Sequence, residues 1–195
     1  MTRHLTAVIV CGLSTCCFGE ERMNRLPKPH YQRKDSDPAW LAYAAQFHGH
    51  LGPWATAGTR AGMAGLRGIE AEGYFDVEVI YEGPFAGPPH SCFLDGLQVA
   101  TGCTMGKRNL RWVKAKEVLV RMKNTRTGKQ VEVRPTAALL ELLTSFKPRP
   151  KAQTAEKDDD HDHAGGHQED PLEAIARKIA KLPEKRILSV KIVGR

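Results

Sequence analysis

Apolar residues recur at every third or fourth position in several stretches of this chain, a spacing that predicts helices with one buried face. Proline, serine and aspartate stand near the starts of these stretches, where they favour the first turn of a helix. We expect Asp37 to cap the first helix, Ser91 the third and Asp170 the last. The expected helices are Ala39–Phe47, Pro53–Ala71, Cys92–Gly102, Thr136–Phe146 and Pro171–Leu182.

Elsewhere apolar and polar residues alternate, which predicts strands that bury one face. The polar stretch 124–129 contains a glycine and is expected to join two of these strands as a hairpin. The fold class is therefore α+β, with helices packed on a mainly antiparallel mixed sheet. The expected strands are Phe75–Tyr81, Glu117–Lys123, Gln130–Arg134 and Ile187–Val193.

The pattern divides the chain into an N-terminal segment (1–37), an α+β domain (38–147), a linker (148–170) and a C-terminal helix and strand (171–195). The linker is charged and poor in apolar residues, so we expect it to be disordered. Three histidines stand among its acidic residues: His161, His163 and His167. They are candidates for weak binding of divalent ions, with a solvated linker as the alternative.

The first 22 residues have two interpretations. Residues 5–18 are apolar behind Arg3, which resembles a short signal or lipoprotein sequence, and they are too few for a membrane span. Residues 19–22 are alternatively a translated ribosome-binding sequence, in which case the protein begins at Met23. The protein is cytoplasmic if Met23 is the true start, and exported or lipid-anchored otherwise.

Small residues form a stripe along the second expected helix: Ala55, Gly58, Gly62 and Gly65. Each glycine inside a helix costs about 1 kcal/mol relative to alanine, so the stripe is expected to permit close approach of another backbone. That backbone belongs either to the same monomer or to a second copy in a dimer. Arg60 and Arg67 on this helix argue against a membrane span.

The formal net charge of +7 is unevenly distributed. Lys and Arg are concentrated between Lys107 and Lys151, which is typical of a solvated hairpin face or of a surface that attracts anions. Only Trp112 and Phe146 are aromatic there, so stacking on single-stranded nucleic acid is not favoured. A nucleic-acid partner is therefore unlikely on this pattern.

Two histidines flank a glycine at the end of the first expected helix. The flexible centre of His48-Gly49-His50 allows both imidazoles to face one cavity, which is a common arrangement of metal ligands. The alternative is that either ring merely caps the preceding helix.

Cys92 stands in the first turn of the third expected helix, where unpaired amides and the helix dipole favour a thiolate. This position suits a metal ligand or a nucleophile. Asp95 lies one turn further on the same face. Cys103 would lie about 16 Å from Cys92 along an unbroken helix, too far to share a zinc ion. We therefore assign Cys103 to a supporting or packing role.

A glycine-rich turn, 102–107, follows this helix. Its spacing does not match a nucleotide-binding P-loop. Gly106, Lys107 and Asn109 are candidates for holding an anionic part of a ligand, and a simple helix C-cap and turn is the alternative.

These motifs together resemble the FmdE family, which takes its name from a component of formylmethanofuran dehydrogenase. The resemblance runs from about Ala39 to Phe146 through three segments: 48–53, 91–98 and 102–109. It implies a core of the type shared by FwdE and the catalytic domain of glyceraldehyde phosphate dehydrogenase, a homodimer and a metal-binding cleft. Many members carry cysteine at the position of Gly52, glycine at that of Arg108 and a C-terminal zinc ribbon. This chain has none of these.

We expect an FmdE-like protein that binds a divalent metal, most readily zinc, through His48, His50 and Cys92. The resemblance associates it with one-carbon metabolism or with molybdenum or tungsten oxidoreductase subunits, and leaves open whether it is itself a catalyst. Cys92, Asp95 and Lys107 are the candidate catalytic residues. One alternative is a metal-independent enzyme with a Cys92 thiolate and a histidine base. The other is an accessory protein with a basic nucleic-acid surface.

Overall fold

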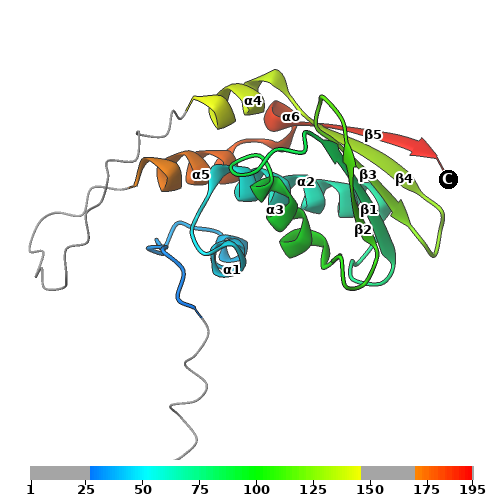
Figure 1. The fold of residues 1–195 in the computed structure, drawn as a ribbon, viewed down its shortest axis with the longest axis horizontal. Coiled ribbons are helices and arrows are strands. Elements are labelled where there is room, and N and C mark those ends of the chain that lie inside the picture. The colour runs from blue at the N-terminus through cyan, green and yellow to red at the C-terminus, as the bar shows by residue number, and fades with distance from the viewer. Residues whose placement is uncertain (1–26, 146–169, 195) are drawn as a thin grey trace, which may run out of the picture.

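A five-stranded mixed sheet forms one side of the molecule (Figure 1). The computed structural model describes residues 27–145 and 170–194, so the signal-like segment and the histidines of the linker lie outside the described residues. The strand order is β2-β1-β3-β4-β5, in which β1 pairs with β2 in parallel and the other pairs are antiparallel. The strands are β1 (Val77–Gly83), β2 (Leu110–Lys114), β3 (Leu119–Asn124), β4 (Gln130–Pro135) and β5 (Leu188–Gly194).

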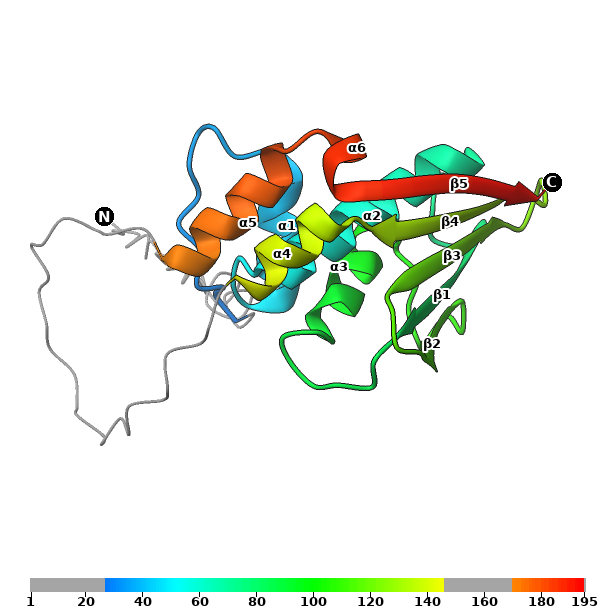
Figure 2. The ribbon, with the colours of Figure 1, turned by 90° about the horizontal axis from the view of Figure 1, so that it is seen from above.

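One face of the sheet is covered by helices, as the view from above shows (Figure 2). Alternation explains this arrangement, because Val79, Met122 and Val131 are buried whereas neighbours such as Lys123 are exposed. The expected α+β class is confirmed. The helices are α1 (Ala39–His48), α2 (Pro53–Ile69), α3 (Cys92–Thr101), α4 (Ala137–Thr144), α5 (Pro171–Lys181) and α6 (Glu184–Ile187).

The glycine stripe of α2 packs inside the monomer. A Cβ atom at Gly58 would lie 2.0 Å from the Phe93 carbonyl oxygen of α3, and one at Gly65 would lie 2.0 Å from the Met122 sulfur of β3. No side chain fits at either position without movement of its neighbours. The close approach brings α3, and with it Cys92, against the N-terminal half of α2.

The C-terminal segment completes the same fold, because β5 lies beside β4 and α5 packs against α2. Arg60 of α2 donates to the Leu182 carbonyl oxygen at 2.9 Å and also to the Ala180 carbonyl, near the end of α5. A second cluster of buried residues joins α1 to α5: Leu41, Ala45, Leu51, Ala176 and Ala180.

Two structural details differ from the expectations. Asp37 does not cap α1: the N-cap residue is Pro38, and the Asp37 carboxylate binds Arg177 instead. Ser91 precedes α3 but its side chain makes no capping hydrogen bond, whereas Asp170 caps α5 as expected. The strand β2 and the short helix α6 were not expected. No helix among residues 27–145 and 170–194 has the length and apolar character needed to span a bilayer.

Candidate functional site

His48 and His50 lie on either side of the turn that ends α1. Gly49 has a φ of +91°, a left-handed conformation that stops the helix and is easiest for glycine. The two imidazole rings are 4.5 Å apart between centroids. The expected pairing of these histidines is therefore present, and it is produced by the glycine between them.

Asp95 holds the His48 ring in a fixed orientation. Its Oδ2 lies 2.6 Å from His48 Nδ1. The bond to Asp95 and, next, the nearby thiol of Cys92 raise the pKa of His48 to about 9, against the opposing effect of burial. Cys92 and Asp95 lie three residues apart at the start of α3, so one helix face brings both groups to the same imidazole.

The other nitrogen of His48 is buried without a hydrogen-bond partner among the described residues. Cys92 lies close enough to affect the pKa, but its sulfur is not in hydrogen-bonding geometry with Nε2. A Cβ atom at Gly52 would lie 3.3 Å from His48 Nε2 and 3.1 Å from His50 Nε2. Both nitrogens therefore face the space that a side chain at position 52 would occupy.

His50 differs from His48 in its electrostatics. Burial, followed by the charge of His48, lowers the pKa of His50. A neutral His50 has a ring nitrogen with a free lone pair, which can accept a proton or bind a metal.

These groups share one cavity of about 520 Å³, which we call the site cavity. The expected grouping of both histidines with Cys92 is thus present in the structure. The residues lining the cavity come from the α1–α2 turn, the loop before α3, the end of α4 and the start of α5: His48, His50, Gly52, Pro53, Trp54, Pro88, Pro89, His90, Cys92, Leu143, Thr144 and Leu172.

Trp54 and His90 belong to this cavity and were not anticipated. Their rings pack at 4.7 Å between centroids. A large aromatic residue at the start of the small-residue stripe was the available signal for Trp54. His90 had no such signal, because the fold of the 84–91 loop brings it to Trp54.

Lys107, Gly106 and Asn109 lie at the opposite end of α3 from Cys92. The Lys107 ammonium donates to the Gly102 carbonyl oxygen at 2.8 Å, and the Asn109 side chain accepts from the Thr104 amide at 3.1 Å. None of the three lines the site cavity. Their assignment to an anionic ligand stays a prediction, separate from the histidine site.

Arg108 in the same turn has a φ of +59°. That conformation favours glycine, which accounts for the glycine expected at this position in related chains. Cys103 is fully buried, and burial raises the pKa of its thiol. Its sulfur lies 3.5 Å from the Val77 carbonyl oxygen, so it packs in the core.

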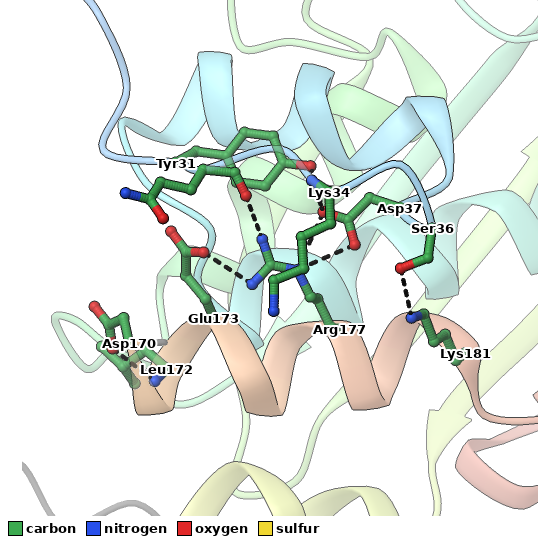
Figure 3. Close-up of polar contacts among 10 residues, drawn as sticks. Tyr31, Lys34, Ser36, Asp37, Asp170, Leu172, Glu173, Arg177 and Lys181 are labelled. Carbon is green, nitrogen blue, oxygen red and sulfur yellow. Dashed lines mark hydrogen bonds and ion pairs between the residues drawn. The ribbon is translucent and has the colours of Figure 1, made fainter. Parts of the chain in front are cut away.

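A cluster of charged groups, which we call the α5 clamp, lies beyond His50 (Figure 3). Arg177 of α5 donates from Nε to both carboxylate oxygens of Asp37, at 3.0 and 3.1 Å, and its Nη1 lies 2.9 Å from Glu173. Tyr31 also donates to Asp37, at 2.9 Å. Burial raises the pKa of Asp37, but bonds from the Lys34 amide, Tyr31 and Arg177 outweigh it and hold this pKa low.

A metal ion finds two preformed nitrogen donors in the site cavity, from His48 and His50. Among the described residues, however, no three His, Cys, Asp or Glu side chains are already grouped to hold an ion. Cys92 would have to turn towards the two nitrogens to complete such a set.

Comparison with known proteins gives three similarities. A family model described as "FmdE, Molybdenum formylmethanofuran dehydrogenase operon" matches residues 47–189. A probable S-adenosyl-L-methionine-binding protein of Archaeoglobus fulgidus is 34% identical over 76 residues, 36% of this chain. The chain spans only 19% of that relative's length.

A solved structure also aligns with this fold. It is an FmdE-like protein of tungsten formylmethanofuran dehydrogenase from Syntrophus aciditrophicus, with 17% identity and a TM-score of 0.49 over 80% of this chain and 71% of that one. The family match spans most of the chain, from the last turn of α1 into β5. The chain therefore belongs to the FmdE family.

Proposed function

We propose that this FmdE protein binds a divalent metal ion, most readily zinc, in the site cavity through His48, His50 and Cys92. The observation that carries the proposal is the buried Nε2 of His48, which has no partner in the described part of the chain. Leaving a buried polar atom unpaired costs about 1–3 kcal/mol, so its retention calls for a functional reason.

The chemistry of the donors fits zinc. Asp95 holds Nδ1 and leaves Nε2 to face the cavity, the arrangement found behind many metal-bound histidines. Imidazole nitrogen and thiolate sulfur are the ligands that zinc prefers. Such an ion, when bound, would act as a Lewis acid towards a ligand in the cavity. The protein residues would orient that ligand and limit its access to water.

The physiological setting is inferred from the family. Its description refers to the operon of a molybdenum formylmethanofuran dehydrogenase. We infer that this chain works with a molybdenum or tungsten oxidoreductase of one-carbon metabolism, as an associated subunit and as a homodimer. Copurification of such an oxidoreductase with the full chain from its native cells is the test.

A second function is favoured by the contact between His48 and Cys92. Asp95 and Cys92 together raise the pKa of His48 to about 9, which keeps an imidazolium beside the thiol at neutral pH. An imidazolium stabilises a neighbouring thiolate, and a thiolate is a nucleophile. On this alternative Cys92 reacts with an electrophile and no metal is required.

Zinc titration of the full chain tests the first proposal. The chain for this titration carries His161→Ala, His163→Ala and His167→Ala, which remove the linker histidines as competing ligands. We expect one equivalent of zinc to bind, and Cys92→Ser or His48→Gln to weaken binding by at least about tenfold. Cys103→Ala is the matched control and should leave the affinity unchanged.

Alkylation separates the two functions. Zinc should protect Cys92 from iodoacetamide, and a chelator should restore the reaction. Rapid alkylation of Cys92 that zinc does not slow would favour the thiolate enzyme. Zinc binding that is lost with the linker histidines, or unaffected by Cys92→Ser, would contradict the metal site.

A further inference from the structure

The site cavity extends well beyond its histidines and cysteine, and the rest of its lining is apolar. Pro88, Pro89, Leu143 and Leu172 contribute to it, and no described lysine, arginine, aspartate or glutamate lines it. The hydroxyl of Thr144 donates at 2.8 Å to a carbonyl oxygen of its own helix. A charged ligand group would therefore lose its hydration here without gaining an ionic partner.

Trp54 is the exception to this apolar lining. The residue is 5% exposed, and its indole Nε1 is buried without a partner among the described residues. An indole N–H can only donate, so it requires an acceptor. Tyr81 and Trp112 also have unpartnered polar atoms, but neither residue lines this cavity.

From these observations we propose that the site cavity binds an uncharged, largely apolar ligand with a hydrogen-bond acceptor, such as a carbonyl oxygen, that accepts from Trp54 Nε1. This inference deepens the proposed function, because it places the ligand beside His48 and Cys92. It does not require the metal, since the apolar walls and the indole donor are present without one. A volume of about 520 Å³ is sufficient for a molecule with one or two rings.

The test uses two probes of nearly equal shape, acetophenone and α-methylstyrene, in which a C=CH₂ group replaces the carbonyl. The full chain, labelled with ¹⁵N and treated with a chelator, contains three tryptophans, so few indole N–H signals have to be assigned. We expect acetophenone to shift the Trp54 signal saturably and to lower field. α-Methylstyrene should bind without that downfield shift.

Substitution isolates the hydrogen bond. In Trp54→Phe, the preference for acetophenone over α-methylstyrene should fall by about fivefold, the effect of one neutral hydrogen bond. Trp112→Phe is the matched control, because it removes another unpartnered indole outside the cavity, and the preference should remain. Benzoate, which has the same size and a negative charge, should bind more weakly than acetophenone.

Three results would overturn the inference: no saturable shift of the Trp54 signal, an equal loss of preference in both variants, or tighter binding of benzoate. Because the titration is made in chelator, its failure is distinct from failure of the zinc site. Zinc binding without probe binding would reject this inference alone. Probe binding without zinc binding would reject the metal and retain the ligand cavity.

Discussion

Two cavities meet at His50 and differ in how their polar groups are satisfied. The first, of about 630 Å³, is lined by the α5 clamp, in which Arg177 and Glu173 have partners. The second, the site cavity, contains buried nitrogens of His48 and Trp54 that have no partner among the described residues.

This difference indicates different roles. A buried ion pair whose hydrogen bonds are all made holds two segments together, here the arm before α1 and the helix α5. Buried atoms left unpaired destabilise the protein and are retained where a ligand can pair with them. The α5 clamp is thus structural, and the site cavity is the candidate for chemistry.

The largest effect is expected from breaking the α5 clamp. Arg177→Met should lower the free energy of unfolding by about 3 kcal/mol, because it leaves the Asp37 carboxylate buried without its cation. Urea denaturation measures the loss. Lys181→Ala, one turn further along α5, removes an exposed bond to Ser36 and should cost less than about 0.5 kcal/mol.

Acid should weaken the same clamp. The pKa of Asp37 is lower in the folded chain than in the unfolded one, so its stabilising contribution is present above the ordinary aspartate pKa. That contribution is lost as the pH falls through the folded value. Equal losses in Arg177→Met and Lys181→Ala, or a gain in acid, would contradict the structural role.

The position of Gly52 offers a second way to sharpen the comparison. Gly52→Cys adds a thiol beside both Nε2 atoms and should tighten zinc binding on the order of a hundredfold, since four-ligand zinc sites bind with about 10–16 kcal/mol. Gly52→Ala is matched in backbone and adds a Cβ 3.1 Å from His50 Nε2, so it should weaken binding. Competition with a chromophoric chelator measures both affinities. No difference between the two variants would show that zinc binds elsewhere.

A smaller effect is expected from Asp95→Asn, which keeps the shape and an acceptor but removes the charge. The pKa of His48 should fall from about 9, as followed by NMR of its imidazole. In the unaltered chain the raised pKa stabilises the fold fully below pH 6.5, and this contribution is lost as the pH rises through about 9. The same loss of protons should strengthen zinc binding over this range.

Asp95→Asn should also weaken zinc binding by about tenfold above pH 9, because the ring is held less firmly. Retention of a pKa near 9 in this variant would show that Asp95 does not set it.

The smallest effect is expected at Lys107. Lys107→Ala removes one exposed bond to the Gly102 carbonyl and should change stability by less than about 0.5 kcal/mol. Zinc and acetophenone affinities should be unchanged, because this residue lies at the far end of α3. A change in either affinity would connect the two ends of the helix.

Features governed by local geometry were predictable from the sequence. Gly49 and Gly102 end their helices in the left-handed conformation, and the Gly58 and Gly62 stripe permits close helix packing. Because these glycines act on their own neighbourhood, the positions of His48, His50 and Cys92 at helix ends followed from them.

Features governed by distant partners were not predictable. Asp37 resembles an N-cap in sequence, but it pairs with Arg177, 140 residues away. The strand β2 begins and ends with partners in β1 that its own basic residues do not indicate. Trp54 and His90 meet only after the 84–91 loop has folded over α2.

Zinc-edge anomalous diffraction from crystals of the full chain with one equivalent of zinc tests the central claim most directly. A single peak is expected within about 2.0–2.1 Å of both His48 Nε2 and His50 Nε2, and about 2.3 Å from Cys92 Sγ. Absence of a peak beside these nitrogens, or a peak confined to other histidines of the chain, would contradict a metal site in this cavity.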